Sequence, residues 1–184
     1  RRKFEGGYVK EPHVGAHDWV VSFDLNSLYP NIIAQWNMSP ETLVMNGDNI
    51  SQAANKVGFD NSREGVFPML VKQYYNDRKS AKIEMIEWQK KQQKEGTSAE
   101  IEKQIATLNN KQMAIKILMN SLFGAMGNKW FRYFDLRVAE GITLTGQHVI
   151  KTCEASINAE LNKLLETKDK DYVIAIDTDS IYVN

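Results

Sequence analysis

Two long stretches of the chain, residues 68–94 and 98–123, are rich in charged and polar residues and predict surface helices. In the second stretch apolar residues recur at helical spacing, at Ile101, Ile105, Leu108, Ile115 and Leu118. Residues 95–97 break the pattern, and Ser98 is a residue type that commonly begins a helix. A short break between two helices predicts an antiparallel hairpin. Because both helices are too polar for a protein core, we expect the hairpin to project into solvent.

A third helical pattern covers residues 137–165. Apolar residues lie on one face of this helix at a period of about 3.6, at Val138, Ile142, Val149, Cys153, Ile157, Leu161 and Leu164. Gly141 and Gly146 lower the intrinsic helix propensity of this segment. We therefore expect these two glycines at places where the helix packs closely on a sheet.

Short runs of β-branched and aromatic residues predict strands near both ends of the chain. Residues 19–23 form an apolar run, which predicts a buried strand that leads into Asp24. Near the other end, residues 172–176 and 180–183 flank a tight acidic turn and predict a β-hairpin. Strands therefore lie on both sides of the long helices.

The segment between the first strand and the helical hairpin predicts one short helix followed by a loop. Pro30 is suited to the first turn of a helix, with residues 27–29 forming the turn into it. Residues 46–64 contain Asn, Asp, Ser and Gly without periodicity, which predicts a loop.

Composition narrows the class of protein. The chain has 184 residues, of which 42% are hydrophobic and 25% charged, as is typical of a folded soluble protein. It contains no apolar run of about 18 residues, so we expect no membrane association. Cys153 is the single cysteine, which excludes a disulfide framework and a cysteine metal site. We therefore expect a reducing, cytoplasmic compartment.

The net charge of zero argues against a protein that simply coats nucleic acid. The charges are unevenly distributed, however. Residues 68–130 contain 11 Lys and Arg against 6 Asp and Glu, whereas the remainder of the chain is acidic. A basic middle segment is thus inserted between acidic flanks. The alternative interpretation is that long surface helices simply carry solvated charge.

Three aspartates occupy positions at which carboxylates can converge. Asp24 ends one strand, and Asp177 and Asp179 lie at the tip of a hairpin. Carboxylates brought together above a sheet repel one another unless a cation neutralises them. Their oxygens suit Mg²⁺, and two such ions can drive in-line phosphoryl transfer. The alternative is that Asp is a common turn residue and needs no ligand here.

Residues 25–33 include no acidic side chain and lead into a helix, whose free N–H groups favour a phosphate. Tyr29 would stand beside a ligand bound there, or else be a half-buried core residue. On the hairpin, Arg78 and Lys82 share one helix face, and the second helix carries a cation and an aromatic residue, Lys116 and Phe123. These cations could grip a triphosphate while the aromatic ring stacks on a base. The alternative is a set of ordinary surface lysines.

These segments, taken in order, resemble the family B DNA polymerases, especially the replicative enzymes of large tailed phages. Residues 23–33 are similar to motif A (D-x-x-S-L-Y-P), and residues 116–124 to motif B (K-x-x-x-N-S-x-Y-G). Residues 177–180 match motif C (D-T-D-S), and residues 4–7 resemble the Y-x-G-G element that links the exonuclease and polymerase modules. Three motifs in the family's order, with a lysine-rich hairpin between the first two, make the resemblance specific.

The resemblance implies an α+β fold, with an antiparallel-sheet palm interrupted by helical fingers. Residues 1–67 would form the first part of the palm with motif A, and residues 129–184 the second part with motif C. Residues 68–128 would form the fingers with motif B. The thumb and exonuclease of the family would be missing, so we expect a cloned fragment or one subunit of a split polymerase.

The resemblance also implies roles for individual residues. The metal ions would be held by the carboxylates of Asp24 and Asp179 and by the backbone carbonyl of Leu25. The catalytic set would be Asp24, Asp177, Asp179 and Lys116, with Asp177 as a supporting carboxylate. The nucleotide would be bound by Leu25, Asn26, Ser27, Leu28, Tyr29, Arg78, Lys82, Lys116 and Asn120, with Tyr29 as the steric gate against a ribose 2′-OH. DNA would be contacted by Phe123, Gly124 and Thr178.

Three positions depart from the family's pattern. Phe123 replaces the Tyr of motif B, Phe4 replaces the Tyr of the linker element, and Ala175 and Ile176 replace the Tyr-Gly that usually precedes motif C. The replacement of Gly by Ile176 would place a larger side chain near the primer end.

The function implied is that of a DNA-directed DNA polymerase acting on primer–template DNA and deoxynucleoside triphosphates in a phage-infected bacterial cell. Two Mg²⁺ ions, replaceable by Mn²⁺, would be the cofactors, and the exonuclease and thumb segments would join in cis or in trans. Two alternatives are an inactive polymerase-like subunit that holds DNA or a partner protein, and a helical-hairpin interaction protein without a nucleotide site.

Overall fold

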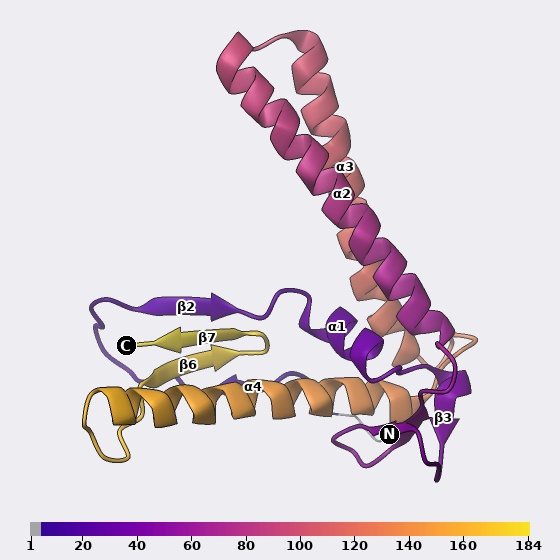
Figure 1. Ribbon diagram of the computed structural model, residues 1–184, viewed down its shortest axis with the longest axis vertical. Helices are drawn as coiled ribbons and strands as arrows, with labels where there is room; N and C mark the ends of the chain where they lie inside the picture. Colours follow the sequence, from indigo (N-terminus) through magenta and orange to yellow (C-terminus); the bar gives the residue numbers. More distant parts are fainter. Residues whose placement is uncertain (1–4) are drawn as a thin grey trace.

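The computed structural model describes residues 5–184, which form an α+β structure with two antiparallel sheets and four α-helices (Figure 1). The larger sheet has the strand order β1-β6-β7-β2, with bounds Val9–Lys10, Val173–Asp177, Ser180–Val183 and Val21–Asp24. The smaller sheet has the order β3-β5-β4, with bounds Leu43–Val44, Gly58–Asp60 and Ile50–Gln52. The helices α1 to α4 span Leu28–Gln35, Val66–Glu95, Ala99–Met126 and Leu136–Leu164, and a short 3-10 helix spans Pro40–Thr42. The predicted α+β class is therefore confirmed.

The larger sheet is covered on one face by α4 and bears the aspartates on the other. Buried residues of the sheet and of α4 pack in one cluster, which includes Ile150, Ile176 and Ile181. Ile176 pairs with Ile181 across β6 and β7, and the next pair along the same strands is Asp177 with Ser180. Because successive side chains of a strand point to opposite faces, the aspartate lies on the face away from α4. The predicted hairpin around residues 177–179 is thus present, as β6 and β7.

The strand predicted at residues 19–23 is present, but the prediction that it is buried is wrong. The strand is Val21–Asp24, and all four of its residues are exposed, Phe23 by 54%. Trp19 precedes the strand with a positive φ of 60° and is 94% exposed. The strand is exposed because β2 is an edge strand of the sheet, whereas the buried cluster lies over β6 and β7. An apolar run does not reveal whether its strand lies at the centre or the edge of a sheet.

The predicted helical hairpin is confirmed, and it projects away from the sheets (Figure 1). Gly96 closes α2 with a φ of 87°, a conformation that glycine adopts without steric cost. Ser98 caps α3, since its side chain accepts a hydrogen bond from the Ile101 N–H at 3.3 Å. Ala81 and Leu108 are buried on the hairpin although most of its surface is exposed.

The base of the hairpin is fixed by the segment that follows α1. Asn37 donates through Nδ2 to the carbonyls of Asp60 and Arg63, and its Oδ1 accepts from the Gly65 N–H at 2.8 Å. Glu41 Oε1 accepts from the Val66 N–H at 2.6 Å, so a carboxylate caps the first turn of α2. A second buried cluster joins α1, the small sheet, the hairpin base and the first part of α4, through Ile33, Met38, Phe59, Val71, Met126 and Ile142.

The prediction of a loop over residues 46–64 is only partly right, because β4 and β5 lie within it. Both are three-residue strands that pair with each other, and Phe59 of β5 is fully buried. Strands this short do not show an alternating pattern. Their pairing partners, rather than a local sequence signal, hold them in place.

The predicted third helix is confirmed, with two differences on its buried face. Leu164, in the last turn, is 75% exposed, because the helix packs on the sheet cluster only as far as Leu161. Ile150, which the pattern did not include, is fully buried. Both glycines are buried and closely packed, but neither packs on a strand. Gly141 lies against Ala53 and Asn55 in the turn between β4 and β5, and Gly146 lies against Tyr29 and Ile32 of α1.

Lys10 ties the larger sheet to α4, because its Nζ lies 2.6 Å from both Glu154 Oε1 and Asp171 Oδ2. Burial alone would raise the pKa of Asp171, but hydrogen bonds from Lys10 and Asn158 outweigh it and hold the pKa below 3.8. A carboxyl with a lowered folded-state pKa stabilises the fold above its unfolded pKa and loses this effect as the pH falls through the folded value.

Replacing Lys10 by Met should therefore lower the free energy of unfolding at pH 7 by about 1–2 kcal/mol. The difference from the wild type should shrink as the pH falls below about 3.8. Urea unfolding at pH 7 and pH 3 measures both effects. Lys72→Met is the matched control, because the Lys72–Glu64 pair is solvent-exposed and worth at most about 1 kcal/mol. An equal effect of the two substitutions would contradict the prediction.

Candidate functional site

The carboxylates of the site are brought together by strand register. Ser180 of β7 is paired with Asp177 of β6 on one side and with Asp24 of β2 on the other. Ser180 Oγ donates to Asp24 Oδ2 at 3.3 Å, and the Leu25 N–H donates to the Asp179 carbonyl at 2.8 Å. The end of β2 is thus joined directly to the β6–β7 turn, and the three predicted aspartates lie at one edge of the sheet.

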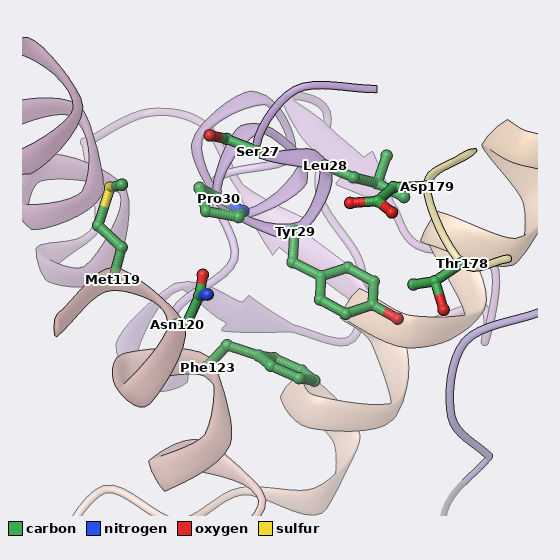
Figure 2. A pocket seen from close by; sticks show the side chains of 9 residues that line it. All are labelled: Ser27, Leu28, Tyr29, Pro30, Met119, Asn120, Phe123, Thr178 and Asp179. Atoms are coloured by element: carbon green, nitrogen blue, oxygen red, sulfur yellow. The ribbon is translucent and has the colours of Figure 1, made fainter. Parts of the chain in front are cut away.

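A cavity of about 330 Å³ lies beside this edge, where the β6–β7 turn, the start of α1 and the base of α3 meet (Figure 2). Its volume is in the range of small-molecule sites. It is lined by Ser27, Leu28, Tyr29, Pro30, Met119, Asn120, Phe123, Thr178 and Asp179. Residues from all three predicted motifs therefore surround a single cavity.

An aromatic pair forms one wall of the cavity. The ring centroids of Tyr29 and Phe123 are 4.7 Å apart and their planes are tilted by 42°. Figure 2 shows the hydroxyl end of Tyr29 directed toward Thr178. Tyr29 is partly buried against the core cluster and also lines the cavity, so it is at once a packing residue and a residue that a ligand would contact.

Asp179 is the charged residue of the cavity lining. Partial burial and the charges of Asp24 and Asp177 raise the pKa of Asp179, and Lys116 acts in the opposite direction. Burial and the charge of Asp179 also raise the pKa of Tyr29. The Asp179 carboxylate is therefore ionised at a cost in free energy, which a bound cation would relieve.

These features define what kind of metal the site could hold. Within residues 5–184, no three His, Cys, Asp or Glu side chains gather into a metal-binding group. The carboxylates that lie close enough to influence one another are those of Asp24, Asp177 and Asp179. Oxygen donors in small number suit Mg²⁺, which keeps several of its waters and binds through one or two carboxylates. The donor set thus fits a magnesium ion.

The start of α1 has no side-chain cap and no acidic residue in its first turn. Ser27 precedes the helix with φ 55° and ψ 46°, and α1 has no acidic residue in its first turn. The side chain of Ser27 does not cap the helix; its Oγ donates instead to Asn26 Oδ1 at 3.2 Å. The first N–H groups of α1, which have no partner within the helix, border the cavity.

The β6–β7 turn is supported from the N-terminal segment. The Thr178 N–H donates to the Tyr8 carbonyl at 2.8 Å, and a Cβ on Gly7 would come within 2.5 Å of Thr178 Oγ1. Gln147 of α4 donates to the Gly6 carbonyl at 2.8 Å. Gly7 of the predicted linker element therefore packs against the acidic turn, and the neighbouring Gly6 is held by α4. Phe4 lies outside the described residues.

The cations predicted from the hairpin are not part of the cavity lining. Arg78 donates from Nε to Gln112 Oε1 of α3 at 3.3 Å, one turn from Lys116. Lys116 is exposed, but it is close enough to influence the pKa of Asp179. Lys82 is exposed, one turn further toward the tip of α2. The lining also excludes other predicted residues, namely Asp24, Leu25, Asn26, Gly124 and Asp177.

One of the residues that depart from the family's pattern lies in the core. The side chain of Ile176 is only 1% exposed and belongs to the cluster beneath the sheet, against α4. The side chain of Ile176 therefore points away from the face that carries the aspartates. The reason is strand alternation, which directs Ile176 and Asp177 to opposite faces.

Three residues near the cavity were not predicted as site residues. Pro30 and Met119 line the cavity, and Gly146 packs behind the Tyr29 ring. Met119 gave no signal in the sequence, because a buried Met on a helix is indistinguishable from a core residue. Gly146 was recognised as a close-packing position, but its partner could not be identified from the pattern.

The chain is similar in sequence to several known DNA polymerases. The chain is 33% identical to the "DNA-directed DNA polymerase" of Escherichia phage RB69, in an alignment covering 98% of this chain and 26% of that protein. It is 34% identical to the enzyme of the same name from Enterobacteria phage T4, over 100% of this chain and 27% of that protein. It is also 36% identical to the "DNA polymerase" of Pyrococcus glycovorans, over 99% of this chain and 21% of that protein.

The chain thus spans about a quarter of the length of the phage relatives. Within the described residues, no helix is long and apolar enough to cross a membrane. The sequence profile described as DNA polymerase family B matches residues 1–184, which is the whole of the chain. With this match and the phage and archaeal relatives together, the chain belongs to DNA polymerase family B.

Proposed function

We propose that this chain is the palm and fingers part of a DNA-directed DNA polymerase, which adds deoxynucleotides to a primer 3′-OH. The observation that carries the proposal is the convergence of Asp24, Asp177 and Asp179 beside a cavity at the base of a basic helical hairpin. Residues 1–67 and 129–184 then make up the palm, and residues 68–128 the fingers. Because the chain spans about a quarter of its phage relatives, the complete enzyme would include further segments, among them a thumb and an exonuclease, in cis or in trans.

The carboxylates of Asp24 and Asp179, with the Leu25 carbonyl, would hold Mg²⁺, for which Mn²⁺ could substitute. Two such ions would activate the primer hydroxyl and neutralise the charge that develops on the leaving pyrophosphate. Asp177, paired with Ser180 on the other side of the turn, would support the site near the primer end. Burial and the charges of Asp24 and Asp177 raise the pKa of Asp179, which supports a cation-binding role.

The triphosphate would lie between the start of α1 and the hairpin. The backbone N–H groups of Ser27 and Leu28 would donate to the β- and γ-phosphates, with Asn26 and the Leu25 backbone beside them. Lys116 would compensate the phosphate charge from α3, as its electrostatic effect on Asp179 indicates. The remaining contacts would be made by Arg78 and Lys82, which lie on α2 of the hairpin, and by Asn120 in the cavity wall.

The sugar and the DNA would be contacted by the aromatic wall and the β6–β7 turn. Tyr29 would pack against the deoxyribose and leave no room for a 2′-oxygen. Phe123, which packs against Tyr29, would support the nascent base pair together with Gly124, and Thr178 would lie beside the primer terminus. The complete enzyme would act in the cytoplasm of a phage-infected bacterium.

Tyr29→Ala tests the sugar contact. Removal of the ring opens space for a 2′-oxygen, so the ratio of ribonucleotide to deoxyribonucleotide incorporation should rise at least about tenfold, equivalent to about 1.4 kcal/mol of lost discrimination. Single-nucleotide primer extension by the complete polymerase with Mg²⁺ measures the ratio. Tyr29→Phe is the matched control, because it keeps the ring and should keep the ratio. An unchanged ratio in Tyr29→Ala would make Tyr29 a packing residue only.

A further inference from the structure

Gly146, in the middle of α4, is buried against the ring of Tyr29. A Cβ atom built on Gly146 would lie 2.8 Å from Tyr29 Cε1 and 3.4 Å from Cδ1. The first distance is well below an ordinary carbon–carbon contact, which begins at about 3.5 Å. The Tyr29 ring thus occupies the volume that any side chain at position 146 would need.

The neighbours of the ring restrict its escape. On α3, the Phe123 ring lies at a centroid distance of 4.7 Å. On α1, Tyr29 is in the first turn, held between the buried Leu28 and the buried Pro30. Three helices therefore fix this one ring, and its remaining free side is the cavity that it lines.

A glycine is otherwise unfavourable at this point. In the interior of a helix, Gly costs about 1 kcal/mol relative to Ala. Gly146 is the eleventh residue of the 29-residue α4, far from either cap. The close approach of the Tyr29 ring supplies a physical reason for the glycine.

We propose that Gly146 is a positioning residue for Tyr29, and that the missing side chain sets how far the ring enters the cavity and so which sugar the site accepts. The inference rests on the proposed role of Tyr29 at the sugar. A methyl group at position 146 would move the ring away from α4, against Phe123 and across the cavity. The space for the deoxyribose would then shrink.

The test is a double-mutant cycle in the complete polymerase. Gly146→Ala should raise the KM for a deoxynucleoside triphosphate at least about fivefold, with a smaller change in kcat, since the reacting groups are untouched. In the Tyr29→Ala background the same substitution should leave KM unchanged. The nearest other atom to the new Cβ, Ile32 Cδ1, lies 3.5 Å away, which is an ordinary contact.

A second readout does not require activity. Thermal unfolding should show that Gly146→Ala lowers Tm when Tyr29 is present. In the Tyr29→Ala background, Gly146→Ala should raise Tm or leave Tm unchanged, because the gain in helix propensity is then unopposed. Gly141→Ala is the matched control. It lies on the same helix, and its Cβ would meet Asn55 and Ala53 at 3.3 and 3.4 Å, so it should not couple to Tyr29 in either measurement.

Equal effects of Gly146→Ala with and without the Tyr29 ring would overturn the proposal, because they would show a packing role independent of Tyr29. An unchanged KM in the single variant would overturn it as well. Failure of the proposed function is distinguishable from both, since it would appear as a wild-type polymerase that adds no nucleotide. In that case the coupling in Tm still decides whether Gly146 sets the position of the ring.

Discussion

Asp179→Asn should abolish nucleotide addition by the complete polymerase, with a loss of about 1,000-fold or more in the rate of the chemical step. Asn keeps the size of Asp but removes the charge that a divalent cation requires. Stabilisation of transition-state charge by bound metal is worth several kcal/mol, and each 1.36 kcal/mol corresponds to about tenfold in rate. Asp24→Asn should have the same consequence, because Asp24 lies on the strand next to the turn that carries Asp179. Rapid-quench primer extension under saturating nucleotide and Mg²⁺ measures the rate.

The fold should survive this substitution. The pKa of Asp179 is raised by burial and by the charges of Asp24 and Asp177, so its ionised form destabilises the metal-free protein. Removal of the charge should leave Tm unchanged or higher when no metal is present. Asp48→Asn, in an exposed loop outside the site, is the control and should retain the wild-type rate. A rate for Asp179→Asn close to that of the control would refute the assignment of the metal ligands.

Lys116→Ala should raise the KM for the incoming nucleotide and lower kcat, for a combined loss of about 100-fold in kcat/KM. Lys116 lies on α3 four residues before Asn120, which lines the cavity, and it influences the pKa of Asp179. A lysine beside the triphosphate acts in binding and also on the charge that grows on the leaving group. Both kinetic parameters should therefore change. Steady-state single-nucleotide kinetics on a fixed primer–template separates the two.

Lys111→Ala is the matched control for this prediction. It removes the same charge from the same helix, five residues closer to the hairpin tip, so it should leave nucleotide kinetics unchanged. If Lys116→Ala weakened DNA binding alone, with KM and kcat for the nucleotide as in the wild type, the residue would belong to the DNA contact surface instead.

The elements of the fold that have long-range periodic patterns were predictable from the sequence. The polar hairpin and the helix at residues 137–165 each repeat their pattern over many turns, so their boundaries differ from the structure by a few residues at most. Ser98 was recognised as a helix start because capping is a local interaction between neighbouring residues. Such signals do not depend on what the rest of the chain does.

The features that failed depend on tertiary position. Whether the apolar strand that ends at Asp24 is central or at the edge is decided by strand order, which its own residues do not encode. The strands β4 and β5 exist because they pair with each other. Ile176 departs from the family's pattern, but only the register of β6 shows that its side chain points into the core.

The candidate site was predictable to a similar extent. The order and spacing of the motifs identified the segments that meet at the cavity, including Tyr29, Asn120 and Asp179. The sequence could not show that the cations of the hairpin stand outside the cavity lining. Nor could it show that Gly146, 117 positions along the chain from Tyr29, lies directly behind the ring. Contacts between distant segments become visible only when the helices are packed.

The most direct test of the central claim is a crystal structure of the complete polymerase with primer–template DNA, a non-hydrolysable deoxynucleoside triphosphate and Mg²⁺. We expect the sugar to lie against the ring of Tyr29 in the cavity, the metal ions to be bound by Asp24 and Asp179, and the triphosphate to lie between the start of α1 and Lys116. A nucleotide bound elsewhere on the molecule, with the cavity empty and the aspartates free of metal, would contradict it.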